Sequence, residues 1–354
     1  LKLREALETE GKTAALVTPD RRIARRVASE LRRWDIEIDD SAGLPLAQTP
    51  PGSFLRLTAE LVAHHYLPLN LLAIGKHPLA TGGMAPAPFR QLIRDIEVSV
   101  LRGPRPASGL AALIDLVPEE QANMKELLET IGLMATDFTA AMAGSKIILG
   151  ELLKTHIAFM EALATSDEQS GRTRLWSGDD GEATAGFVAE LMEVSNVLGE
   201  IEPVSYPALL DVLMKGRTVR PNFGSHPRLM ILGLLEARLQ HADLIVLGGL
   251  NEGTWPPDVS SDPWMSRPMR KDFGLPSPER RIGLTAHDYQ QAFCAPEVVM
   301  TRASRVDGIP TVPSRWLMRL EKLLLGSDSS TADTLFFPGP WLHWQAQLDR
   351  PNEV

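Results

Sequence analysis

The chain has 354 residues, of which 44% are hydrophobic and 23% are charged, and its formal net charge is −9. This composition is typical of a globular protein, and the length favours two domains. The absence of an 18-residue apolar run and of an amino-terminal signal pattern predicts a protein with no membrane partner. The one cysteine, Cys294, excludes an internal disulfide, and we expect a cytoplasmic protein.

The charge is distributed unevenly along the chain. Residues 113–211 hold 18 acidic and 5 basic residues, whereas residues 265–320 hold 9 basic and 5 acidic residues. A protein of negative net charge can therefore still present a basic face to phosphate groups while its acidic part avoids nucleic acid. Ordinary solvated helix faces are the alternative explanation.

The first 85 residues predict the beginning of an α/β domain. Residues 14–20 (AALVTPD) predict a buried strand, and the following arginine-rich stretch has apolar residues at helical spacing with Asp20 as its N-cap. A second strand is expected at 36–39 and a further amphipathic helix at 53–65. A Gly- and Pro-rich segment then predicts a domain boundary near residue 85.

Residues 86–225 predict a helical domain, because strand patterns are nearly absent and six stretches show helical periodicity. Between two of these stretches, the polar segment 166–182 predicts a loop that carries Arg172, Arg174 and Trp176. Basic and aromatic side chains together can bind nucleic acid by stacking and phosphate contact. A surface loop that turns its tryptophan inward is the alternative.

Strand patterns return after residue 226, at 228–234, 243–249 and 297–303, with helices expected at 279–293 and 313–325. The simplest architecture is one discontinuous α/β domain with a parallel sheet, built from 1–85 and 226–325, into which the helical domain is inserted. Residues 326–354 are expected to be an exit segment toward a missing carboxyl-terminal domain, with Trp341 and Trp344 packing back. Since the chain begins with leucine, we expect a piece of a longer protein.

The stretch LIVLGGLNEGTWPP, residues 244–257, has the pattern of a buried parallel strand that ends in a glycine-rich loop. Loops at the carboxyl ends of such strands commonly hold ligands in α/β proteins. The glycines could equally serve only to turn the chain, and Trp255 could fill an apolar gap. The residues of the loop alone leave both interpretations open.

No catalytic motif is present in the sequence. The segment EGKT at 10–13 resembles the end of a phosphate-binding loop, but Ala6 replaces the first glycine and the segment precedes a strand instead of following one. The eight histidines show no metal-binding spacing, and the serine-nucleophile pattern G-x-S-x-G is absent. We expect no catalytic residue, no metal and no cofactor in this chain.

Residues 226–303 resemble the second RecA-like domain of UvrD-like superfamily 1 helicases. More closely, GLLEAR (233–238), GLNEGTWP (249–256), the following stretch through ERRIGLTAHDYQQAF, and EVVMTRA (297–303) are similar to AddB-type subunits of AddAB helicase-nucleases, which repair double-strand breaks. The amino-terminal TPDRRIARRVASELRRW also fits this family. The resemblance implies a 2A-like domain that carries a 2B-like helical insertion.

The sequence departs from the active helicases where ATP hydrolysis is coupled to movement. Active relatives have threonine and histidine on the first of these strands, where this chain has Ile231 and Leu232. The arginine that reaches the γ-phosphate in active relatives has no counterpart in HDYQQAF. The resemblance therefore implies an inactivated helicase module that is not an enzyme by itself.

The resemblance and the local basic charge together suggest functional residues near the carboxyl ends of the strands. We expect Gly249 and Gly253 to shape the family-motif loop, and Asn251 and Glu252 to fix it by side-chain hydrogen bonds. The candidates for DNA contact are Arg267, Arg270, Lys271, Arg302 and Arg305, with Trp255 as a stacking or wedge residue against DNA or the helical insertion.

The leading hypothesis is thus a scaffold and DNA guide within an AddAB-like complex, with DNA and an AddA-like motor subunit as partners. A free-standing α/β enzyme without recognisable motifs is one alternative. A purely protein-binding platform, whose basic residues face the motor subunit, is another.

Overall fold

The computed structural model describes residues 1–103, 106–220, 226–259, 262–327 and 340–350. The chain divides into two compact units, which are described separately here. An α/β unit contains residues 1–42 and the part of the chain after Arg220, and a helical unit contains Gly43–Arg220. Within the described residues, no helix is both long and apolar enough to cross a membrane.

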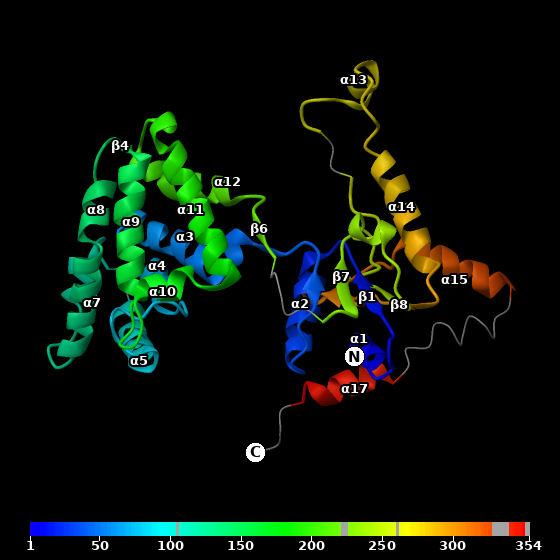
Figure 1. Cartoon of the computed structure of the whole chain (residues 1–354), viewed down its shortest axis with the longest axis horizontal. Helices are drawn as coiled ribbons and strands as arrows, with labels where there is room; N and C mark the ends of the chain where they lie inside the picture. Colours follow the sequence, from blue (N-terminus) through cyan, green and yellow to red (C-terminus); the bar gives the residue numbers. More distant parts are fainter. Residues whose placement is uncertain (104–105, 221–225, 260–261, 328–339, 351–354) are drawn as a thin grey trace. The chain divides into compact units, whose positions relative to one another are not determined.

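The α/β unit is built on a parallel sheet of five strands in the order β2-β7-β1-β8-β9. Segments distant in sequence lie side by side in it, with the blue amino-terminal strand next to yellow-green strands (Figure 1). Ala14 pairs with both Leu229 and Leu244, so β1 lies between β7 and β8. The bounds are β1 Ala14–Val17, β2 Asp39–Asp40, β7 Leu229–Leu232, β8 Leu244–Leu247 and β9 Glu297–Met300.

Alternating side chains of the strands form two apolar layers, one on each face of the sheet. Along β1, Leu16 lies in the layer with Ala24 and Leu31 of α2, whereas Val17 lies in the layer with Trp255 and the helices that follow β8. The helices and short strands of this unit are α1 Lys2–Ala6, α2 Arg21–Arg32, η4 Glu236–Leu239, α13 Arg267–Asp272, α14 Arg280–Phe293, β10 Arg305–Val306, β11 Ile309–Pro310, α15 Arg315–Ser327 and α17 Trp341–Leu348. The prediction of a discontinuous RecA-like α/β domain is confirmed.

The predicted beginning of the helical insertion, near residue 85, is wrong by about 40 residues. The helical unit already begins at Gly43, where β3 (Leu44–Pro45) pairs antiparallel with β6 (Thr218–Val219). The helix expected at 53–65 is α3 (Pro50–Ala63), but its buried Phe54, Leu55 and Leu61 belong to the helical core and not to the sheet. An amphipathic pattern indicates that one face of a helix is buried, but it does not indicate which hydrophobic core that face joins.

The helical unit contains one large apolar core, to which α9 contributes the side chains of His156, Phe159 and Met160. Its other elements are η1 Leu46–Gln48, α4 Pro68–Gly75, α5 Pro86–Ile96, η2 Glu97–Leu101, α6 Leu110–Ile114, α7 Ala122–Met134, α8 Thr136–Met142, β4 Ile147–Ile148, α9 Leu149–Ala164, α10 Gly171–Trp176, α11 Gly178–Leu198, β5 Glu200–Ile201, η3 Pro203–Ser205 and α12 Tyr206–Met214.

The polar segment 166–182 is not a loop that could stack bases. It contains helix α10, whose N-cap Ser170 accepts a hydrogen bond from the backbone of Thr173. The guanidinium of Arg174 donates to the carbonyl oxygens of Leu79 and Ala164, and Trp176 Nε1 donates to Glu161 Oε1 at 2.8 Å. These side chains are therefore occupied in holding helices together.

Within the exit segment, residues 341–348 form α17, and residues 328–339 lie outside the described residues. Lys2 Nζ lies 4.1 Å from the centre of the Trp341 ring, so α17 packs back against α1. Trp344 remains 46% exposed, and the prediction that it packs back does not hold.

Candidate functional site

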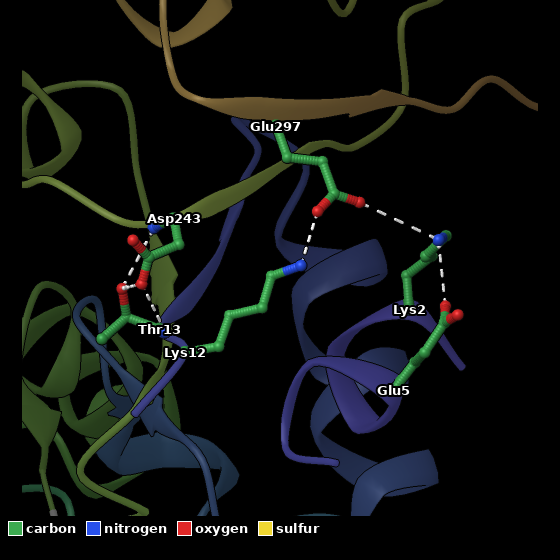
Figure 2. Close-up of polar contacts among 6 residues, drawn as sticks. All are labelled: Lys2, Glu5, Lys12, Thr13, Asp243 and Glu297. Atoms are coloured by element: carbon green, nitrogen blue, oxygen red, sulfur yellow. Dashed lines mark hydrogen bonds and ion pairs between the residues drawn. The ribbon is translucent and has the colours of Figure 1, made fainter. Parts of the chain in front are cut away.

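The EGKT segment lies at the amino edge of the sheet, where it ties strands together (Figure 2). The backbone nitrogen and Oγ1 of Thr13 both donate to Asp243 Oδ2 at 2.8 Å, which joins the starts of β1 and β8 and lowers the pKa of Asp243. Lys12 Nζ lies 2.5 Å from Glu297 Oε2 at the start of β9, and this bond raises the pKa of the lysine. Lys2 approaches the other oxygen of Glu297 at 4.0 Å.

This amino edge is the opposite end of the strands from the one where α/β proteins bind phosphate at a helix N-terminus. Lys12 is engaged by the carboxylate of Glu297 on β9, from which β1 is separated by β8, and β1 does not lead into a loop around the lysine. The position of EGKT thus agrees with the interpretation that it is not a phosphate-binding loop.

At the carboxyl edge, the loop 248–257 has the backbone that its glycines were expected to permit. Gly249 and Gly253 have φ angles of +77° and +82°, which side chains rarely adopt. A Cβ atom at Gly249 would also lie 2.6 Å from Ile23 Cδ1 of α2. The positive φ angle therefore favours glycine at position 249, where a side chain would also displace the end of Ile23.

Asn251 and Glu252 fix the loop by side-chain hydrogen bonds, as predicted. Asn251 Nδ2 donates to the carbonyl of Ala303 at 2.7 Å, and its Oδ1 accepts from the backbone nitrogen of Ala303 at 3.0 Å. The Glu252 carboxylate accepts from the backbone nitrogen and the guanidinium of Arg315, which lowers the pKa of Glu252. The loop after β8 thereby holds both the segment after β9 and the start of α15.

The expectation that Trp255 stacks on DNA or acts as a wedge is wrong. Its side chain is 0% exposed, and its Nε1 donates to the carbonyl of Gly248 at 3.0 Å. The rings of Tyr289 and Trp316 meet it edge-on, with centroids 6.2 and 6.4 Å away. Trp255 instead fills the apolar layer between the sheet, α14 and α15, because these helices supply an aromatic pocket that the loop sequence does not reveal.

Two of the basic candidates, Arg302 and Arg305, follow β9 directly and are exposed at the carboxyl edge. Arg302 precedes Ala303, which Asn251 holds, and Arg305 begins the short β10–β11 hairpin. Neither arginine belongs to any ion pair in the described parts of the chain. Their charge is therefore available to an anion at this edge.

The other three candidates, Arg267, Arg270 and Lys271, lie on α13, which Figure 1 shows at the end of a protruding segment, beyond the start of α14. Arg267 pairs with Glu279 at 2.6 Å, and Arg270 pairs with Asp262 at 3.1 Å and donates to the carbonyl of Pro276. Lys271 is exposed. The five candidates thus form two groups, one at the sheet edge and one at this tip, although all five were expected near the carboxyl ends of the strands.

An ion pair that the sequence did not predict joins two stretches that lie about 50 residues apart in the chain. Arg238 of GLLEAR donates to both carboxylate oxygens of Asp288 in HDYQQAF, at 2.7 and 3.1 Å. The carboxylate of Asp288 is buried, with the residue 6% exposed, whereas Arg238 remains partly exposed. The sequence contains the opposite charges of Arg238 and Asp288, but no sequence pattern indicates that η4 and α14 lie next to each other.

The described residues contain no group of three His, Cys, Asp or Glu side chains arranged to hold a metal ion. No protein-family model matches the chain. An uncharacterized protein of Rickettsia felis is similar, with 21% identity over 150 residues that cover 42% of this chain. The matched part is 17% of the length of that protein.

Proposed function

We propose that this chain is a non-catalytic, helicase-like module of an AddB-type subunit, which guides DNA and serves as a scaffold in the repair of double-strand breaks. The observation that carries the proposal is the pair of exposed arginines, Arg302 and Arg305, on either side of Ala303, whose backbone Asn251 holds by two hydrogen bonds at the carboxyl edge of a RecA-like sheet. In this proposal the chain works in the cytoplasm beside an AddA-like motor subunit.

The character of the strand ends supports a role without ATP hydrolysis. Ile231 and Leu232 close β7 as buried apolar side chains, so that strand presents no polar group for coupling. Lys12, the one lysine in a phosphate-loop-like context, lies at the other edge in contact with Glu297. Both features favour a module that positions DNA while its partner supplies the motor.

The first prediction concerns the arginines at the sheet edge. Replacing both Arg302 and Arg305 with glutamate should weaken DNA binding and lower the slope of log affinity against log salt by about 1.5 to 2, because each phosphate that the protein no longer neutralises keeps its condensed counterion. Filter binding across a salt series measures both quantities.

The matched control is the double change Lys125→Glu and Lys146→Glu, which reverses two exposed lysines of the acidic helical unit. This control should leave the salt slope as it is. If the Arg302 and Arg305 changes also leave the salt slope unaltered, the result would favour the protein-binding platform over the DNA guide.

The second prediction is that the chain releases no phosphate from ATP with magnesium and DNA ends. Because Lys12 forms a surface ion pair with Glu297, Lys12→Ala should change stability little, as for other surface pairs, and should leave ATP turnover at background. A coupled phosphate-release assay tests this. DNA-stimulated release that Lys12→Ala abolishes would restore the motor interpretation.

A further inference from the structure

The segment 262–281 forms a braced tip around α13. One oxygen of Asp262 accepts from the backbone nitrogens of Trp264 and Met265, at 2.9 and 3.3 Å, and the other pairs with Arg270. Ser266 caps α13 by accepting from the backbone of Met269. These local bonds hold the backbone of the tip in a defined shape.

The tip exposes large apolar side chains. Trp264 is 87% exposed and Phe273 is 74% exposed, which makes Trp264 the most exposed of the seven tryptophans, all of which the structure describes. Exposed aromatic side chains that adjoin charged groups mark interaction sites more often than isolated apolar residues do. Their flat faces are free to receive another ring.

A pocket of about 600 Å³ lies at the base of the tip, and its charged lining residues are three arginines, Arg270, Arg280 and Arg281, and the carboxylate of Asp262, which pairs with Arg270. Among the described residues, no acceptor lies within hydrogen-bond distance of the buried Nε of Arg270. Guanidinium groups that converge on a pocket favour an anion with several oxygen acceptors, such as a phosphate. Pro263, which also lines the pocket, directly precedes Trp264, so the pocket and the exposed ring adjoin.

We propose that this tip binds single-stranded nucleic acid, with a backbone phosphate in the arginine pocket and unpaired bases stacked on Trp264 and Phe273. The inference rests on the proposed DNA-guiding function and names the form of DNA that this site takes. A duplex keeps its bases stacked on one another, so only an unpaired strand offers base faces to these rings. The balance of five basic to three acidic residues in the tip suits a polyanion.

The test measures the affinity of the full chain for a fluorescein-labelled 20-nucleotide oligothymidylate and for a 20-base-pair duplex, by fluorescence anisotropy at low salt. Trp264→Ala should weaken binding of the single strand by about fivefold to a hundredfold and change duplex binding less than twofold. The control Trp344→Ala, which removes a half-exposed tryptophan of α17, should change neither affinity.

Two further measurements examine the parts of the site separately. Unlabelled oligothymidylate should quench tryptophan fluorescence in the unaltered chain, and most of the quenching should disappear with Trp264→Ala. Arg281→Gln should lower the salt slope for the single strand by about 0.7, as expected for one phosphate contact.

Equal weakening of single-strand and duplex binding by Trp264→Ala would overturn the stacking site. Unchanged single-strand binding in that variant, together with weaker binding after charge reversal at Arg302 and Arg305, would overturn this inference and leave the proposed function standing. Failure of the unaltered chain to bind either nucleic acid would overturn both. Equal competition by polyglutamate would assign the tip to an acidic protein instead.

Discussion

Replacing Trp255 with alanine is expected to lower the free energy of unfolding of the α/β unit by about 3–5 kcal/mol. The side chain is completely buried between the sheet and the aromatic rings of Tyr289 and Trp316, and its removal leaves a large cavity. The carbonyl of Gly248 would also lose one of its two donors, although Thr18 Oγ1 still reaches it at 2.9 Å.

Urea unfolding followed by far-UV circular dichroism measures this loss, with the transition of the α/β unit analysed separately from that of the helical unit. Trp344→Ala is the matched control, and we expect it to cost about 0.5 kcal/mol or less because this ring is half-exposed. A Trp255→Ala chain as stable as the control would contradict the core position of this ring. DNA binding should weaken in parallel, since Asn251 in the same loop holds the segment of Arg302 and Arg305.

Acidification is expected to destabilise the helical unit through His156, which is completely buried. Its two ring nitrogens lie 2.8 Å from Thr58 Oγ1 and 2.9 Å from the Tyr206 hydroxyl, and the ring stacks on Phe138. Burial lowers the pKa of His156 from 6.5 to about 3, so the side chain stays neutral in the folded chain. Burial also lowers the pKa of His77 in this unit, to about 4.

The direction of the effect follows from proton binding. Well above pH 6.5 the ring is neutral in both the folded and the unfolded chain, and it makes no pH-dependent contribution. As the pH falls from 6.5 toward 3, the unfolded chain binds a proton that the folded chain excludes, so stability is lost progressively. Between pH 7 and pH 5, His156 alone should lower the free energy of unfolding by about 2 kcal/mol.

The measurement is the stability of the helical unit at intervals from pH 7 to pH 5. His156→Gln should be less stable at pH 7, because it alters a buried hydrogen-bonded site, but its stability should depend less steeply on pH. His343→Gln changes an exposed histidine and should keep the original dependence. An equally steep decline after His156→Gln would assign the acid sensitivity to other groups.

Local features of the sequence were sufficient to predict β1, β7, β8, β9 and the form of the family-motif loop, whereas the strand expected at 36–39 is the short β2 at Asp39–Asp40. Short apolar runs such as LIVL at 244–247 can bury both faces only as inner strands of a covered sheet, and β8 is buried throughout. Asp20 caps α2 by accepting from the backbone of Arg22, as its position before the helix predicts. Gly249 and Gly253 have the positive φ angles that a tight turn requires.

Features that depend on which surfaces meet were decided only by the tertiary structure. The amphipathic pattern of α3 was recognised, but its assignment to the helical core depended on partners far away in the sequence. Trp255 and Trp264 are alike as residues in Pro-rich loops, yet one is 0% exposed and the other 87%, because only the first lies beneath α14 and α15. Periodicity along a chain indicates that a side chain is buried, but it does not identify the residues that bury it. Those contacts, and ion pairs such as the one between Asp262 and Arg270, form only when segments of the chain come together in the tertiary structure.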